Sequence, residues 1–193
     1  MIYNYKTLSV EEFTALKKDK KIKLDPSFQV GTDEESRWDK KQQSKYIRSV
    51  LLGSAPSAFV VVNCELAYQN NLERGNDNTS IEYFDGLRGE FRWLSIDGNN
   101  RSIALRNFVD GKVTIPSGVY YLKNGVPVII KRGENNKFST MERSLREQFL
   151  KSKVLVSEYE DVQWSDLGVL FRNINDGIHL NPQMNRQSNP SPI

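Results

Sequence analysis

Apolar residues recur along the chain at two spacings, and short runs or period-two alternation predict strands. Residues 58–63 (AFVVVN) form a β-branched run that is typical of a buried strand. Residues 91–96 (FRWLSI) and 153–159 (KVLVSEY) alternate well enough for two more strands. Residues 119–130 hold two β-rich runs around an Asn-Gly pair at 124–125, which predicts a hairpin.

The second spacing is helical. Residues 40–53 carry apolar side chains three and four positions apart and end in a glycine, which predicts an amphipathic helix. The same pattern predicts helices over residues 100–109, closed by Gly111, and over 165–174. An S-x-x-E capping box at 139–142 predicts a further helix that runs to about residue 151.

These elements predict an α+β fold with a mixed sheet and flanking helices in a single domain. We expect residues 1–30 to be an N-terminal extension whose charged run at 17–23 is a solvated helix end. Residues 31–180 form the expected domain, with a polar surface loop or insertion at 70–80. Residues 181–193 are rich in Asn, Pro and Ser and are expected to be a flexible or truncated tail.

Composition excludes several kinds of site. The 193 residues contain one cysteine, Cys64, and one histidine, His179, so a disulfide, a Cys-rich zinc site and a His-based metal cluster are all disfavoured. Lys and Arg total 27 against 24 for Asp and Glu, so any nucleic-acid surface must be local. The sequence predicts no metal ligands, no membrane segment and no secretion signal, and we expect a cytoplasmic protein.

The segment 96–101 (IDGNNR) carries the candidate chemistry. A strand delivers Asp97 to its end, Gly98 permits a tight turn, and the N-terminus of the next helix suits an anion. Asn99 and Asn100 can hydrogen-bond a base or ribose, and Arg101 can fork onto a phosphate. On these residues alone, the alternative is a plain turn in which Asp97 caps the helix and Arg101 lies at the surface.

Three segments in order resemble the ParB-like domain of GmrSD-type modification-dependent restriction enzymes and related phage-defence nucleases. They are residues 36–57 (SRWDKKQQSKYIRSVLLGSAPS), 96–111 (IDGNNRSIALRNFVDG) and 170–186 (LFRNINDGIHLNPQMNR). The second is similar to the family's Asp-Gly-Gln-Gln-Arg signature with both glutamines replaced by asparagine. The first departs in spacing, because Arg37 directly precedes Trp38.

The resemblance implies a ParB/sulfiredoxin-like fold and a central pocket. The residues that it assigns to this pocket are Arg37, Asp97, Gly98, Asn100, Arg101 and Asn175. It further implies that Asp97 organises water or a metal and that Arg101 neutralises phosphoryl charge as the catalytic pair. Since Arg101 lies one turn into the helix, we expect its replacement by Ala to weaken binding and to leave the fold intact.

Two main functions follow from the resemblance. The first is a nucleotide- or DNA-handling module of a restriction, phage-defence or phage DNA-processing protein, which hydrolyses a nucleoside triphosphate with Mg²⁺ and is linked to DNA cleavage. The family often works with an HNH nuclease domain, whose motif this chain lacks. The alternative is a non-catalytic sensor of modified DNA or of a nucleotide that acts through such a partner. A weaker third is an enzyme acting on a base or on a phosphate-containing small molecule.

Overall fold

A five-stranded mixed sheet organises the molecule. The computed structural model describes residues 3–24, 36–54, 58–118, 120–123, 126–131 and 136–176. In spatial order the strands of the sheet are β1 (Tyr3–Ser9), β7 (Lys153–Tyr159), β3 (Phe59–Asn63), β4 (Trp93–Asp97) and β2 (Ile22–Lys23). The pairs β1–β7 and β3–β4 are antiparallel, and the pairs β7–β3 and β4–β2 are parallel.

Neighbouring residues on the central strands point to opposite faces, as the pleat of a strand requires. Val61 and Trp93 belong to one hydrophobic cluster, whereas Val62 and Leu94 belong to a second. The sheet therefore separates two cores. This explains why residues 58–63 read as an unbroken apolar run, because both faces of β3 are covered.

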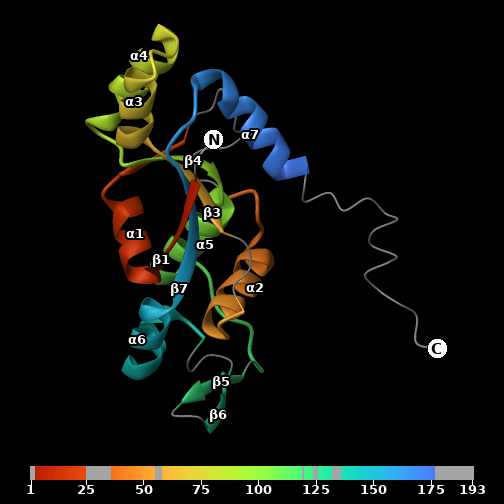
Figure 1. Cartoon of the computed structure of the whole chain (residues 1–193). Coiled ribbons are helices and arrows are strands. Elements are labelled where there is room, and N and C mark those ends of the chain that lie inside the picture. The colour runs from red at the N-terminus through yellow and green to blue at the C-terminus, as the bar shows by residue number, and fades with distance from the viewer. Residues whose placement is uncertain are drawn as a thin grey trace, which may run out of the picture.

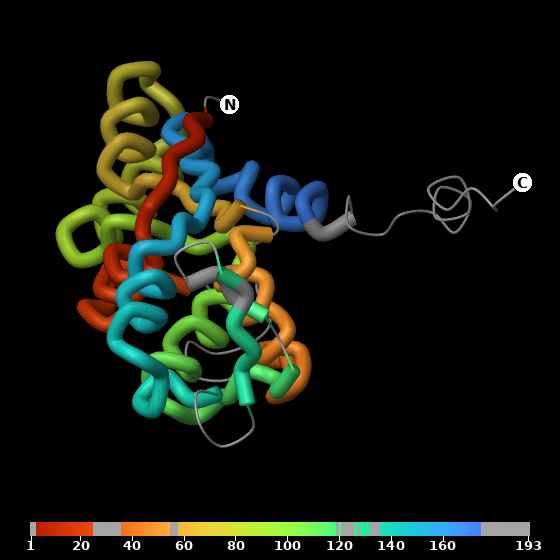
Figure 2. Tube along the Cα trace, turned by 90° about the horizontal axis from the view of Figure 1, so that it is seen from below, coloured from red at the N-terminus to blue at the C-terminus, as the bar shows by residue number. Residues whose placement is uncertain are grey.

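The helices divide between the two cores. The first core receives apolar side chains from α1 (Val10–Lys18), α2 (Lys40–Leu51), α5 (Asn99–Val109) and α6 (Arg143–Lys151). The second receives them from α3 (Cys64–Glu73), α4 (Asn78–Arg88) and α7 (Trp164–Asp176). Figure 1 shows α3 and α4 at one end of the molecule and α6 at the other. In Figures 1 and 2, α1 and α7 lie on opposite sides of the molecule.

The N-terminal residues belong to this architecture and do not extend from it. All seven residues of β1 pair with β7, and Ser9 then caps α1 through a capping box with Glu12. Val10 and Phe13 of α1 are buried in the first core. The expected N-terminal extension is therefore wrong over residues 3–24. The sequence does not predict β1 because this edge strand is largely exposed, so apolar and polar side chains do not alternate clearly along it.

The predicted hairpin is confirmed. β5 (Tyr120–Lys123) and β6 (Val126–Ile129) pair antiparallel as a separate two-stranded sheet. The Asn-Gly pair at 124–125 lies outside the described residues, as does the expected tail at 181–193. The helix after 139–142 is also confirmed, but the capping box is wrong: Ser139 lies in the 3-10 helix η1 (Phe138–Thr140), and no side chain caps α6.

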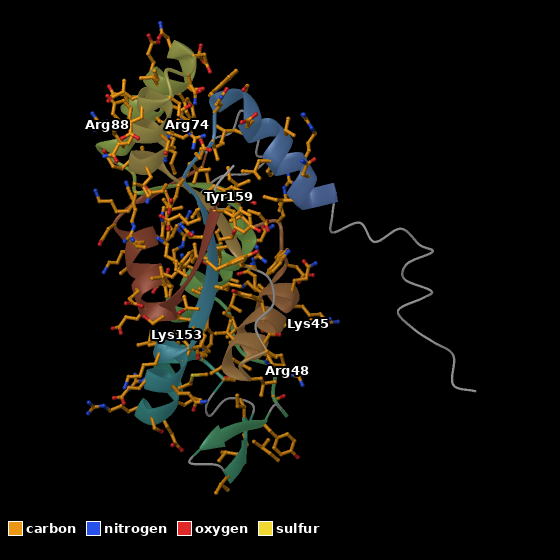
Figure 3. All side chains as sticks on the ribbon, in the orientation of Figure 1. Lys45, Arg48, Arg74, Arg88, Lys153 and Tyr159 are labelled. Atoms are coloured by element: carbon orange, nitrogen blue, oxygen red, sulfur yellow. The ribbon has the colours of Figure 1, made fainter. Side chains whose placement is uncertain are left out.

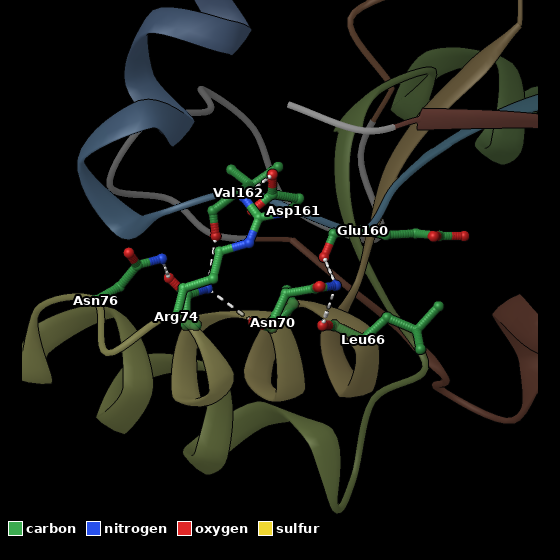
Figure 4. A network of polar contacts seen from close by, with 9 residues as sticks. Leu66, Asn70, Arg74, Asn76, Glu160, Asp161 and Val162 are labelled. Atoms are coloured by element: carbon green, nitrogen blue, oxygen red, sulfur yellow. Dashed lines mark hydrogen bonds and ion pairs between the residues drawn. The ribbon is translucent and has the colours of Figure 1, made fainter.

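The segment 70–80 is helical, and the prediction of a surface loop is wrong. It contains the end of α3, a turn at Gly75 and the start of α4. Its asparagines bind the connection between β7 and α7: Asn70 Nδ2 donates to the carbonyl oxygen of Glu160 at 2.9 Å, and Asn71 Nδ2 donates to that of Val162 at 2.9 Å. Arg74 pairs with Asp161 at 2.7 Å (Figure 4).

The prediction of an α+β single domain is therefore confirmed. Helices and strands mix around one five-stranded sheet, and sequence-distant strands such as β1 and β7 are neighbours. Within the part of the chain that the structure describes, none of the helices has the length and apolar character needed to cross a bilayer.

Candidate functional site

The candidate site begins where β4 ends. Asp97 is the last residue of β4, and α5 starts at Asn99, so the predicted strand-to-helix turn is confirmed. Gly98 links them with φ +109°, a backbone conformation that side chains with a Cβ rarely adopt. The glycine also lies against an aromatic ring, since a Cβ at this position would stand 2.5 Å from Cδ1 of Phe59.

Gly98 leaves the N-terminus of α5 without a side-chain cap. Asp97, the expected alternative cap, instead pairs with Arg101 one turn into the helix. The backbone N–H groups of the first turn of a helix carry roughly half a positive charge in total. This end of α5 therefore keeps the electrostatic character that favours an anion.

Arg101 points inward. Its side chain is 9% exposed, and its Nη2 donates to Asp97 Oδ2 at 2.7 Å and to the carbonyl oxygen of Ala58 at 3.0 Å. The guanidinium also lies over the ring of Phe59, 5.3 Å from the centroid. The alternative in which Arg101 lies at the surface is therefore wrong, and its contact with a phosphate stays a prediction. The side chain ties the end of β4 to the residue before β3.

Asn100 brings the first predicted segment to the site. Its Oδ1 accepts a hydrogen bond from the backbone N–H of Arg37 at 2.8 Å and another from Ser36 Oγ at 3.1 Å. The backbone of Arg37 is therefore held at the first turn of α5, and its side chain is exposed. Ser36 was not predicted, and the only sequence signal for it is its place beside Arg37.

Asn99, another predicted site residue, is half-buried in the first turn of α5, and its carbonyl oxygen accepts a hydrogen bond from Ser102 Oγ at 2.8 Å. Trp38 is partly buried and packs edge-on against Tyr46, with ring centroids 5.7 Å apart. Asn175 belongs to α7, and the prediction that its side chain opens onto the site stays a prediction. His179 lies outside the described residues.

No family model, curated protein or solved structure matches this chain. The resemblance to ParB-like domains consequently stays a prediction, and the chemistry of the site has to be argued from its own residues.

Asp97 is the carboxylate that was expected to organise a metal or water, and it gives one oxygen to Arg101. Among the described residues, no three His, Cys, Asp or Glu side chains come together in a way that could hold a metal ion. A nucleoside triphosphate with Mg²⁺ needs only one or two carboxylates besides its own phosphates, so the expected cofactor stays a prediction.

Burial raises the pKa of two side chains in the hydrophobic cores. Burial raises the pKa of Tyr46 to about 12, and the positive charge of Arg101 offsets part of that effect. Burial likewise raises the pKa of Cys64 to about 12. Both groups are therefore neutral at physiological pH, and neither can act as a proton acceptor there.

Basic residues gather around a small cavity between the start of α2 and the residues that follow α5. Three lysines line a hollow of about 390 Å³ together with Ser44, Val113 and Thr114; the lysines are Lys40, Lys41 and Lys112. Among the described residues, no carboxylate lines it, although Lys112 lies 3.6 Å from Asp110. The first two follow Arg37 in sequence at the start of α2, whereas Lys112 follows α5 and was not predicted.

Proposed function

We propose that this chain is a binding module for DNA or a nucleotide, and that it holds a phosphate group at the N-terminal end of α5. The observation that carries the proposal is the hydrogen bond from the backbone N–H of Arg37 to Asn100 Oδ1 at 2.8 Å. It fixes the backbone of Arg37, whose side chain is exposed, beside a helix N-terminus that no side chain caps. Both features favour the same kind of ligand, an anion.

The proposed phosphate-binding surface also takes in the start of α2 and the turn after α5. We define this basic face by Arg37, Lys40, Lys41 and Lys112, of which the three lysines line one cavity. All four side chains are exposed. A nucleic-acid backbone presents phosphates at regular spacing, so a row of exposed cations suits it better than a single ion does.

Binding fits the site better than hydrolysis does. Catalysis of phosphoryl transfer needs a cation directed at the reacting phosphate and a group that orients water. In this protein Arg101 and Asp97 neutralise each other at 2.7 Å, and the arginine side chain is 9% exposed. The pair supports the turn, and Arg37 and the helix N-terminus are left to bind the ligand.

Under this proposal the protein is a ParB-like sensor module that binds its ligand without hydrolysing it. In keeping with the resemblance, cleavage of DNA would be carried out by a nuclease domain or subunit outside this chain. A cytoplasmic location would follow from such a role, since the DNA of a restriction or phage system is found there.

A thermal-shift panel tests the proposal. The probes are ATP, GTP, and short DNA duplexes with and without a modified base, each with and without Mg²⁺. A ligand at a hundred times its dissociation constant stabilises the native state by about 2.7 kcal/mol. We expect at least one phosphate-bearing probe to raise the melting temperature of the wild-type protein.

Two variants of Asn100 supply the control. Asn100→Ala removes the acceptor for the N–H of Arg37 and should reduce the ligand-induced shift. Asn100→Asp keeps an acceptor for that N–H but adds a negative charge, so it should hold the segment in place and still weaken binding of an anion. A shift of the same size in all three proteins would place the phosphate elsewhere.

A further inference from the structure

A larger cavity lies at the opposite end of α5. It has a volume of about 750 Å³ and is bounded by α1, β2, the residues before β4 and the last turn of α5. From Asn100 to Asp110 the helix advances about 15 Å at 1.5 Å per residue, so this cavity is separate from the site at the N-terminus of α5. We call it the α1–β2 cavity.

Its lining is charged on one part and apolar on the other. Five basic residues contribute, and they are Lys17, Lys18, Lys20, Lys23 and Arg106. Three acidic residues contribute, and they are Glu11, Glu90 and Asp110. The apolar part comes from Ala15, Ile22, Phe91 and Val109.

The lining of the cavity carries more positive charge than is needed to offset the partial negative charges at the C-termini of α1 and α5. α1 and α5 both end beside this cavity, and basic residues in a last turn offset the partial negative charge of a helix C-terminus. That explanation covers Lys17, Lys18 and Arg106. It does not cover Lys20 and Lys23, which follow α1, and each C-terminus carries only about half a negative charge.

Lys20 occupies a position that glycine would fill more easily. Its φ is +55°, and it is the only described residue other than glycine with a positive φ. This left-handed conformation directly follows the end of α1, where glycine is the usual residue. A lysine there keeps its side chain at a conformational cost, and that side chain lines the cavity.

The walls are held in place by short contacts. Lys21 Nζ donates to the carbonyl oxygen of Glu90 at 3.1 Å, and the carbonyl oxygen of Lys21 accepts from the N–H of Arg92 at 2.9 Å. The ammonium of Lys23 lies 5.1 Å from the centroid of the Phe91 ring. Lys17 is 9% exposed, so most of its stem is packed into the wall.

We propose that the α1–β2 cavity binds a free nucleoside phosphate. The volume lies in the range of small-molecule sites, roughly 300–1,000 Å³, and exceeds what a bare phosphate ion needs. The lysines receive the phosphate, the apolar wall receives the base, and the carboxylates accept hydrogen bonds from ribose hydroxyls or base amino groups. The same three carboxylates oppose a long polyanion, which favours a single nucleotide over a DNA strand.

Calorimetric titration of the full chain with ADP, AMP, adenosine, inorganic phosphate and a short single-stranded oligonucleotide tests the proposal. We expect ADP to bind saturably and more tightly than either adenosine or phosphate. Two variants address the cavity. Lys17→Met keeps the packed stem but removes the charge. It should lower the affinity for ADP about tenfold, which is the equivalent of one charge-assisted contact.

Lys20→Gly separates binding from stability. The substitution removes a cation and relieves the strain of the left-handed backbone. It should therefore raise the melting temperature and weaken the binding of ADP. A role that is only structural would not produce this opposite movement. The control is Lys45→Met, since Lys45 lies on α2 and does not line the cavity (Figure 3). The affinity of this variant for ADP should equal that of the wild type.

Four outcomes would overturn the proposal. ADP affinity that survives both cavity variants would place the nucleotide elsewhere, and its loss in Asn100→Ala alone would place it at the N-terminus of α5. Phosphate as tight as ADP would remove the nucleoside from the ligand. Binding of the oligonucleotide without binding of ADP would make the source a nucleic acid.

Discussion

Gly98 and the ring of Phe59 are in contact across the end of the sheet, and a Cβ on Gly98 would meet Cδ1 of the ring at 2.5 Å. The glycine also has φ +109°. Backbone strain and overpacking would therefore act together in Gly98→Ala, and we expect a loss of about 2–5 kcal/mol in the free energy of unfolding. Urea denaturation followed by circular dichroism measures it.

Gly86→Ala is the matched control for this substitution. Gly86 lies within α4, and nothing is within 4 Å of a Cβ built there. Alanine is favoured over glycine inside a helix by roughly 0.5–1 kcal/mol, so this variant should be more stable than the wild type. If Gly98→Ala were equally harmless, the turn would not depend on glycine.

The pair formed by Asp97 and Arg101 should contribute to stability and should show coupling. Arg101→Met leaves Asp97 without its partner and should cost about 1–3 kcal/mol, less than a fully buried pair because Asp97 is 26% exposed. The double variant with Asp97→Asn should recover part of that loss. Equal losses that simply add would mean that the two side chains act independently.

The sequence predicts much of the architecture because the central elements have strong periodic patterns. β3, β4, β7, α2 and α5 were all expected from the spacing of apolar residues, which depends only on which face of each element is buried. The strand-to-helix turn at Gly98 followed from the same patterns.

The orientation of Arg101 could not be predicted in this way. An arginine one turn into a helix can turn outward to solvent or inward to a carbonyl, and the choice depends on Ala58, which is distant in sequence. The same limit applies to Asn70 and Asn71. Their polarity suggested a loop, whereas they satisfy backbone carbonyls of a segment about 90 residues later.

Cys64 should resist thiol reagents in the folded protein. Its side chain is fully buried, and burial raises the pKa of the thiol to about 12. A raised thiol pKa means that the nucleophilic thiolate is scarce below that pH, so the reaction at pH 8 should be slow in buffer and complete in denaturant. Rapid labelling of the native protein with a chromogenic disulfide reagent would contradict the buried position.

The strength and salt dependence of DNA binding follow from the number of exposed cations on the basic face. Arg37, Lys40, Lys41 and Lys112 are exposed, although Lys112 lies 3.6 Å from Asp110, whereas Arg101 is largely buried and paired with Asp97. Release of counterions from about four phosphates predicts a slope near −3 to −4 in a plot of log K against log salt concentration. Such a module should bind unmodified duplex with a dissociation constant of about 1 μM or weaker at physiological salt.

Fluorescence anisotropy with a labelled duplex at several salt concentrations measures both quantities. Replacing the three lysines of the basic face by Gln should bring the slope near −1, since about one phosphate contact would remain. A matched triple variant, Arg88→Gln, Lys151→Gln and Lys153→Gln, removes the same charge from the ends of α4 and α6 and the start of β7, and should leave the slope unchanged. Figure 3 labels Arg88 and Lys153. Nanomolar, sequence-independent binding by the wild-type chain would instead indicate a self-sufficient DNA-binding protein, because so few cations cannot supply that affinity.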